Sequence, residues 1–196
     1  MTEPPATASE DTASQGTVLS AAFYERSVLQ VAPELLNKVL VAGNRRGRIV
    51  EVEAYGGEDD PGSHGWRGMT PRTELMFGPA GVWYVYLSYG VHWCANVVVS
   101  APGTCAAVLI RAVEPIAGID EMRAARGGVR DRDLANGPGK LTVAMGVDGA
   151  LNGCHIDQSA MRIVDDGTAP PPHAARTPRI GLSENRAPNR PWRFIL

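Results

Sequence analysis

The chain has 196 residues, of which 44% are hydrophobic, and a formal net charge of −2. This length predicts one domain with enough apolar side chains for a sizeable core, and the near-neutral charge does not by itself indicate a nucleic-acid partner. The three cysteines are odd in number and form no Cys-x-x-Cys motif, which argues against a disulfide framework or a zinc finger and fits a reducing cytoplasm.

Residues 1–18 are rich in Ser, Thr, Ala and Pro and hold almost no large apolar side chains. Such a segment cannot bury enough surface to offset the entropy of ordering, so we expect a disordered tail over 1–18 and a folded domain over 19–196. The N-terminus lacks a positive start and an apolar stretch, and no apolar run approaches the length of a membrane span. We therefore expect a cytoplasmic protein without a membrane partner.

Arginine dominates the basic residues. Lys38 and Lys140 are the two lysines among 19 basic residues, which leaves 17 arginines. The planar guanidinium binds two phosphate oxygens at once, so this bias suits a phosphate-rich partner. A genome rich in arginine codons would produce the same count.

Apolar spacing predicts helix within residues 19–38, interrupted at Pro33, and then a short strand over 39–42 with a turn after it. Residues 48–64, RIVEVEAYGGEDDPGSH, carry the first chemical signal. Their first half alternates, which predicts a strand with one apolar face and one face bearing two carboxylates and a phenol. The apolar face would hold Val50, Val52 and Ala54, and the other face would hold Ile49, Glu51, Glu53 and Tyr55.

The GGEDDPG turn after this strand could return His64 to the carboxylate face. A carboxylate, an aromatic ring and an imidazole would then meet in a reaction-site arrangement. The same pattern also describes the solvated face of an ordinary antiparallel strand followed by an acidic loop.

Residues 82–100, VWYVYLSYGVHWCANVVVS, give the strongest strand signal in the chain. We predict a β-hairpin with Gly90 at positive φ in the turn, which leaves Tyr89 at the tip. Core packing explains an exposed tip aromatic poorly, although the tip could also fold back and bury Tyr89. Side chains on the two arms would share faces in two sets, Tyr84 with Tyr86, and His92 with Cys94 and Asn96.

Residues 105–113, CAAVLIRAV, predict a buried strand with one charge, Arg111. An unpaired buried charge is costly, so Arg111 needs a partner, and Glu53 is the obvious candidate. The other interpretation is an arginine that reaches solvent from a strand end. We further predict a helix over 115–126 with Pro115 at its start, a short apolar helix after the Gly-rich turn at 136–140, and closing strands over 179–182 and 191–196.

Together these segments resemble the alkyladenine (3-methyladenine) DNA glycosylases of the single-domain mammalian and bacterial type. The resemblance runs in one order over residues 19–196 and is weakest over 147–176. The matching stretches are RIVEVEAYGGEDDPGSH, TPRTELMFGPAGVWYVYLSYGVHWCANV, AAVLIRAVEP, LANGPGKL and the closing RIGL and RPWRF.

The resemblance implies an α+β fold, with a single domain around a mixed, mainly antiparallel sheet, a protruding β-hairpin and surrounding helices. It also implies base excision repair of double-stranded DNA that contains damaged purines, in which the hairpin enters the minor groove and the damaged nucleotide rotates into a pocket. By this resemblance Glu53 matches the general base and Arg111 the residue that helps to hold the attacking water.

Other positions match the base pocket and the DNA contact of that family. Tyr55 and His64 match one wall of the pocket, and Tyr86 matches the opposite, stacking wall. Asn96 matches the residue that disfavours guanine by crowding its exocyclic amine. The hairpin-tip residues Tyr89 and Gly90 match the group that replaces the flipped base, and Met76 matches an apolar side chain that wedges near the opposite strand.

General chemistry agrees with this interpretation. A base inside a duplex must leave the stack before a carboxylate can act on it, and stacking on aromatic side chains returns about 1–3 kcal/mol per base. Alkylation makes a purine cationic, which strengthens its attraction to aromatic faces and weakens its bond to the sugar. Because neither lysine lies near the Glu53 strand in sequence, we predict a monofunctional hydrolase that leaves an abasic site.

We expect a monomer without cofactor or metal, associated with the nucleoid if the source is bacterial. Two other functions stay open at this point. One is a nucleic-acid-binding module that uses the hairpin but performs no chemistry. The other is a small-molecule hydrolase or metal enzyme that uses His64, His92 and Cys94, although no third ligand has supporting spacing.

Overall fold

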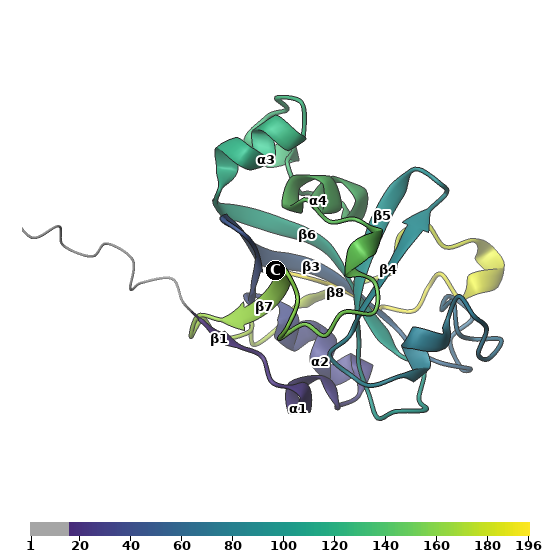
Figure 1. Cartoon of the computed structure of the whole chain (residues 1–196). Helices are drawn as coiled ribbons and strands as arrows, with labels where there is room; N and C mark the ends of the chain where they lie inside the picture. The colour runs from purple at the N-terminus through teal and green to yellow at the C-terminus, as the bar shows by residue number, and fades with distance from the viewer. Residues whose placement is uncertain (1–15) are drawn as a thin grey trace, which may run out of the picture.

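A long central strand, β3 (Arg45–Tyr55), organises the sheet in the computed structural model, which describes residues 16–196 (Figure 1). The sheet has nine strands in the order β1-β7-β2-β3-β6-β5-β4, and β9 pairs with both β3 and β8. All of these strand pairs are antiparallel. The other strands are β1 (Thr17–Val18), β2 (Val39–Ala42), β4 (Trp83–Ser88), β5 (His92–Val98), β6 (Ala107–Ala117), β7 (Met161–Asp165), β8 (Ala175–Thr177) and β9 (Arg193–Ile195).

Within residues 16–196, four short helices accompany the sheet. They are α1 (Ala21–Tyr24), α2 (Val28–Leu35), α3 (Ile119–Ala125) and α4 (Pro138–Met145). Single 3₁₀ turns occur at Glu74–Phe77, Asp131–Asp133, Gly149–Leu151 and Glu184–Arg186. In Figure 1, α1 and α2 lie below the central strands, α3 and α4 lie above them, and the β4–β5 hairpin projects beside α4. The predicted α+β fold around an antiparallel sheet is confirmed.

The core is built from the apolar sides of α2 and α4 together with the inner face of the sheet. Leu35, Leu141, Ile49, Trp83 and Phe194 belong to this cluster, and each is fully buried. Burying a large apolar side chain contributes about 1.5–3 kcal/mol relative to leaving it exposed. A rigid platform therefore supports the strands that carry the polar residues discussed below.

Strand β3 departs from the predicted alternation. Ile49 belongs to the core with Val52 and Ala54, whereas Val50 is only half-buried. The reason is a pair of compensating register shifts against β6, because Glu51 pairs with Ala112 between the pairs Ile49–Val113 and Val52–Ile110, which leaves Val50 and Arg111 without a partner in the ladder. A β-bulge inserts one unpaired residue, which exchanges the faces of the residues on either side of it.

Two other segments differ from the predicted elements. Residues 115–117 continue β6, with Pro115 opposite Gly47, and helix α3 starts only at Ile119. Proline is tolerated in a strand where the ladder is irregular, and a register shift lies at this point. Residues 179–182 form no strand, because β8 ends at Thr177 and a loop follows it.

The predicted tail over residues 1–18 lies mostly outside the described residues. Its last two residues, Thr17 and Val18, pair with Asp165 and Val164 of β7, so ordered structure begins before residue 19. Within residues 16–196, no helix combines the length and apolarity that crossing a bilayer requires.

Candidate active site

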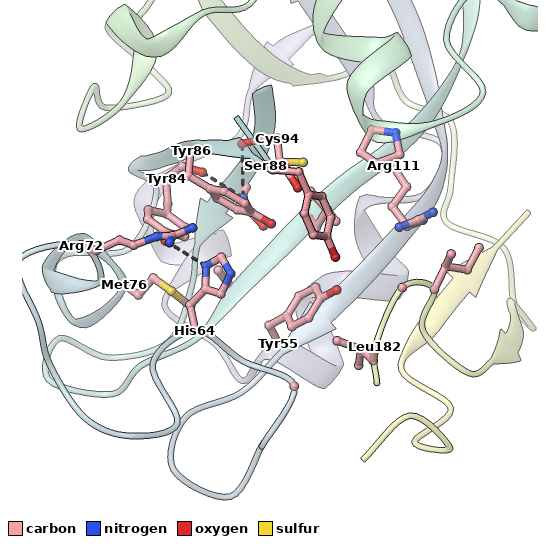
Figure 2. Close-up of a pocket in the computed structure, with 18 residues that line it drawn as sticks. Tyr55, His64, Arg72, Met76, Tyr84, Tyr86, Ser88, Cys94, Arg111 and Leu182 are labelled. Atoms are coloured by element: carbon pink, nitrogen blue, oxygen red, sulfur yellow. Dashed lines mark hydrogen bonds between the residues drawn. The ribbon is translucent and has the colours of Figure 1, made fainter. Parts of the chain in front are cut away.

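A pocket of about 520 Å³ opens beside the β4–β5 hairpin (Figure 2). Its walls come from β3, β4, β5 and β6 and from three loops. The side chains that matter for its chemistry are Tyr55, His64, Arg72, Met76, Tyr84, Tyr86, Tyr89, Cys94, Asn96, Arg111 and Ile180. Seven of the nine residues singled out from the sequence therefore line one cavity: Tyr55, His64, Met76, Tyr86, Tyr89, Asn96 and Arg111.

Glu53 lies directly behind this wall and is completely buried. The Tyr55 hydroxyl donates to Glu53 Oε2 at 2.7 Å, and the backbone N–H of Ile180 donates to Oε1 at 2.8 Å. Burial and the negative charge of Glu53 raise the pKa of Tyr55, so this hydroxyl stays protonated and remains a donor. Among the described residues, Oε2 has Tyr55 as its one hydrogen-bond partner, and a carboxylate oxygen has room for a second donor such as water.

Arg111 completes the surroundings of Glu53, as the sequence predicted. Its Nη1 lies 3.2 Å from Glu53 Oε1, and its Nε donates to Glu51 Oε1 at 2.7 Å. Arg111 is the residue skipped between Ala112 and Ile110 in the pairing of β6 with β3, so the bulge directs it toward both carboxylates. The interpretation of Arg111 as an arginine that reaches solvent is wrong, because the residue is buried mid-strand.

The surroundings of Arg111 and Glu51 favour the charged form of each side chain. Burial would lower the pKa of Arg111, but the charges of Glu53 and Glu51 outweigh it and raise the value. Burial would raise the pKa of Glu51, but hydrogen bonds from Arg193 and Arg111 hold it below its ordinary range. Arg193 Nε donates to Glu51 Oε1 at 2.6 Å, so two guanidinium groups balance two carboxylates.

Three aromatic side chains, His64, Tyr84 and Tyr86, form one wall of the pocket, so the expectation that His64 and Tyr86 stand on opposite walls is corrected. The ring centroids of His64 and Tyr86 are 4.6 Å apart, and those of Tyr84 and Tyr86 are 5.4 Å apart. His64 Nδ1 lies 3.0 Å from the Tyr84 hydroxyl. Burial, together with the positive charges of Arg72 and Arg186, lowers the pKa of His64 to about 4, so the imidazole is neutral near pH 7.

Asn96 is buried at the same wall, on the strand beside Tyr84. Its Nδ2 donates to the backbone carbonyl of Tyr84 at 3.0 Å and lies 3.5 Å from that of Cys94. These contacts orient the amide and leave Oδ1 as the group that can meet a ligand.

The hairpin tip has the predicted exposure. Tyr89 is 94% exposed, and its φ of +50° precedes a φ of +70° at Gly90. Two consecutive left-handed residues define a type I′ turn, which matches the twist of the flanking strands. A bulky residue in this conformation is uncommon, and such outliers concentrate at functional positions.

Met76 is in a different place from the one that its expected role requires. It is 2% exposed and packs with Tyr84, Val98, Cys105 and Ala107 at the base of the pocket. A side chain buried under the pocket cannot wedge into the opposite DNA strand, so that expectation for Met76 is corrected.

Sequence reasoning missed three residues that surround Glu53 and Tyr55. Ile180 reaches it through the backbone, and Asp60 and Arg179 form a completely buried ion pair beside Tyr55. Asp60 had the appearance of an ordinary turn residue and Arg179 that of a strand residue. The signal available was a charged residue flanked by Pro178 and Ile180, which demands a partner. Among residues 16–196 there is no group of three or more His, Cys, Asp or Glu side chains that could hold a metal ion.

Comparison with known proteins places this geometry in context. A family model described as methylpurine-DNA glycosylase matches residues 22–196. A Burkholderia cenocepacia protein provisionally named 3-methyladenine DNA glycosylase is 51% identical over 185 residues, covering 92% of this chain and 88% of its own. Proteins with the same provisional name from Burkholderia lata and Rhodopseudomonas palustris are 52% and 47% identical, over 92% of this chain and 88% and 85% of theirs.

Proposed function

Because the chain belongs to the methylpurine-DNA glycosylase family and is a DNA repair glycosylase, we propose that it extrudes an alkylated or deaminated purine and hydrolyses its bond to the sugar with Glu53. The observation that carries this proposal is the buried Glu53 carboxylate, hydrogen-bonded to Tyr55 directly behind an aromatic pocket. The product is an abasic site in double-stranded DNA.

Extrusion of the nucleotide needs a side chain that fills the gap in the base stack. Unstacking and unpairing a nucleotide costs a few kcal/mol, and an aromatic ring in the vacated space returns part of that cost. Tyr89 suits this task because its ring stands almost fully exposed in the loop between β4, which ends at Ser88, and β5, which starts at His92. Val91, 67% exposed, adds apolar surface beside it.

The extruded base enters the pocket and contacts Tyr86 and His64, whose rings stand at 67° to each other, so that it stacks on one ring and meets the other edge-on. A neutral imidazole matters here, because an alkylated purine is cationic and a charged His64 would repel it. The pKa of about 4 for His64 keeps the wall neutral at the pH of a cell. Asn96 Oδ1 crowds the region beside Tyr84 and favours bases without an exocyclic group at that point.

Hydrolysis requires one activated water. Its oxygen attacks C1′ of the sugar, its proton passes to Glu53, and the electron pair of the C1′–N bond leaves with the base. A cationic alkylated base departs as a neutral molecule and needs little help, whereas a neutral deaminated base departs as an anion that takes up a proton from solvent. Arg111 Nη1, 3.2 Å from Glu53 Oε1, holds the carboxylate in place while the water binds.

The isosteric variant Glu53→Gln tests the proposal. General-base removal lowers rates by about 10²–10⁴-fold, so base release under single-turnover conditions should fall by that factor. Affinity for a duplex with an uncleavable abasic analogue should stay close to that of the wild type. A variant that releases 3-methyladenine or hypoxanthine at the wild-type rate would instead favour the non-catalytic binding module.

The reaction stops at the abasic site. A glycosylase that also cuts the backbone needs an amine that forms a Schiff base. Lys38 is buried and paired with Asp165 at 2.8 Å, and Lys140 donates to Asn136. Neither lines the pocket. Borohydride should therefore trap no covalent enzyme–DNA adduct, and a trapped adduct would contradict this part of the proposal.

The proposed working form is a monomer that acts on nucleoid DNA in the cytoplasm, since the relatives are bacterial proteins. Size-exclusion chromatography with light scattering, with and without a damaged duplex, should give the mass of one chain and of a one-to-one complex.

A further inference from the structure

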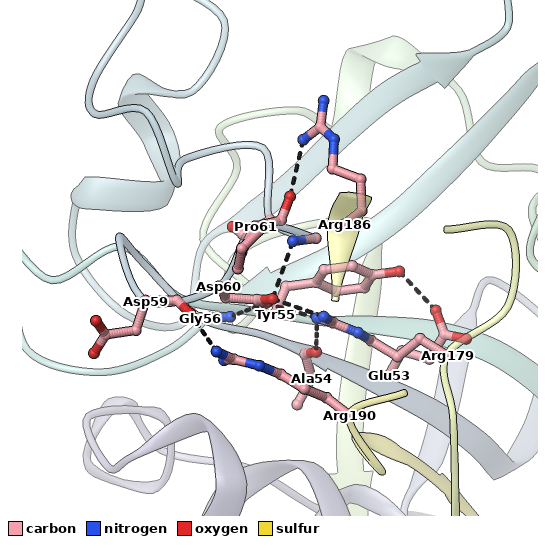
Figure 3. Close-up of polar contacts among 12 residues, drawn as sticks. Glu53, Ala54, Tyr55, Gly56, Asp59, Asp60, Pro61, Arg179, Arg186 and Arg190 are labelled. Carbon is pink, nitrogen blue, oxygen red and sulfur yellow. Dashed lines mark hydrogen bonds and ion pairs between the residues drawn. The ribbon is translucent and has the colours of Figure 1, made fainter. Parts of the chain in front are cut away.

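Asp60 and Arg179 form an ion pair with both side chains completely buried (Figure 3). Arg179 Nη1 donates to Asp60 Oδ2 and Nη2 donates to Oδ1, each at 2.6 Å. Taking two charges out of water is expensive, so replacing such a pair by apolar residues is often neutral or stabilising. A role in placing neighbouring groups explains the pair better than stability alone.

Asp60 holds the turn that follows β3. Its carboxylate accepts the backbone N–H of Gly56 at 2.9 Å and that of Gly62 at 3.1 Å. Arg186 and Arg190 donate to the carbonyls of Pro61 and Asp59, at 3.0 and 2.5 Å. Residues of the C-terminal segment therefore hold the loop over residues 56–64 in place through backbone hydrogen bonds.

Arg179 contacts β3 itself. Its Nη1 also donates to the carbonyl of Ala54 at 2.9 Å, and its guanidinium carbon lies 4.7 Å from the centroid of the Tyr55 ring. The Trp192 ring lies 5.2 Å away from the same carbon. A planar guanidinium can hold a carboxylate and stack on a ring at once, which an ammonium cannot do.

Arg179 is adjacent to both groups that donate hydrogen bonds to Glu53. Ile180, the residue after Arg179, donates its N–H to Glu53 Oε1, and the Tyr55 hydroxyl donates to Oε2. The Ile180 N–H belongs to the residue that directly follows Arg179. The Tyr55 ring, which carries the other donor, stacks on the Arg179 guanidinium. We propose that Arg179, anchored by Asp60, is a positioning residue that sets the orientation of the Glu53 carboxylate toward the pocket. This inference rests on the proposed role of Glu53 as the base.

Two variants displace the guanidinium in different ways. Arg179→Lys keeps the charge but loses the two-pronged contact and the stacking. Gly62→Ala keeps both charges, but its Cβ would lie 2.5 Å from Arg179 Nη2. The matched control is Arg26→Lys, since Arg26 also makes a two-pronged contact with a carboxylate and stacks on a ring, but away from the pocket.

Three quantities are measured for each full-length variant: the single-turnover rate of base release, the affinity for a duplex with a tetrahydrofuran abasic analogue, and the midpoint of thermal unfolding. Loss of a hydrogen bond to a charged group predicts a rate about 10- to 100-fold lower for Arg179→Lys and Gly62→Ala. Affinity should change by less than about threefold, because Arg179 is buried and an abasic analogue places no base in the pocket that Gly62 lines. Arg26→Lys should match the wild type in both the rate of base release and the affinity.

A lower rate of base release with unchanged DNA affinity would indicate that Arg179 positions Glu53, rather than only stabilising the fold. Folded Arg179→Lys and Gly62→Ala proteins with wild-type rates would overturn the inference, as would losses of rate and affinity in equal proportion. If Arg179→Lys does not fold, Gly62→Ala decides, and failure of both to fold would assign the pair to folding alone. Glu53→Gln, measured alongside, distinguishes the two proposals, because wild-type activity in that variant refutes the role of Glu53 itself.

Discussion

Replacing Tyr89 by Asn should make the protein more stable and less active. Tyr89 has a φ of +50°, and its side chain is 94% exposed, so few contacts hold it in the folded state. The left-handed conformation costs an ordinary residue about 1–2 kcal/mol. Asn tolerates this conformation, and Asn-Gly is a preferred pair for a type I′ turn.

The size of the stability gain follows from this strain. Asn should recover about 0.5–1 kcal/mol in the free energy of unfolding, since it relieves part of the cost and loses almost no burial. For a domain of this length, that gain raises the midpoint of thermal unfolding by about 1–4 °C. Far-ultraviolet circular dichroism during heating measures the midpoint of unfolding. Urea titration measures the free energy of unfolding.

Activity should change in the opposite direction. A ring that stacks in the vacated base position contributes about 1–3 kcal/mol, which corresponds to a loss of about 5- to 150-fold in the single-turnover rate. Tyr89→Phe is the control, because it retains the ring and the backbone strain and should retain both the rate and the stability. A Tyr89→Asn protein that is less stable than the wild type, or that releases bases at the wild-type rate, would refute this reasoning.

Two further predictions concern the charged and titrating groups of the pocket. Arg111→Met removes the ion-pair partner of the buried Glu53, while Glu51 keeps Arg193, and should lower the free energy of unfolding by about 3–5 kcal/mol in a urea titration, whereas Arg26→Met at the surface should cost less than about 1 kcal/mol. Equal losses in the two variants would contradict the burial argument. His64 has a pKa of about 4 when folded and an ordinary value of 6.5 when unfolded, so its contribution to stability is intact above pH 6.5 and is lost as the pH falls toward 4. His64→Phe should show a shallower decline over that window. The difference between the two proteins should be small because His64 is only partly buried, and parallel curves would exclude this linkage.

The cluster around Glu53 shows how a fold turns a locally ordinary strand into a site. An exact alternation along β3 would have placed Ile49 on the face of the two carboxylates. The bulges between β3 and β6 move Ile49 into the core and direct Arg111 toward Glu51 and Glu53. A bulge of this kind is therefore a functional part of the architecture.

Sequence alone determined the elements whose signals are local. The Val- and Tyr-rich hairpin around Gly90 was predicted with its tip, because its residues favour strands and its turn needs a left-handed position. The pairing of Glu53 with Arg111 was also predicted, since a charge inside an apolar strand must find a partner. The fold class followed from a resemblance that rests on several long stretches in one order.

Only the tertiary structure decided the features that depend on distant contacts. Asp60 and Arg179 meet across 119 positions of sequence, and neither residue shows its partner in its own surroundings. The burial of Met76 and the continuation of β6 through Pro115 likewise depend on what packs or pairs opposite them. Local patterns report the period of a segment, whereas register, bulges and long-range ion pairs are set when the segments pack together.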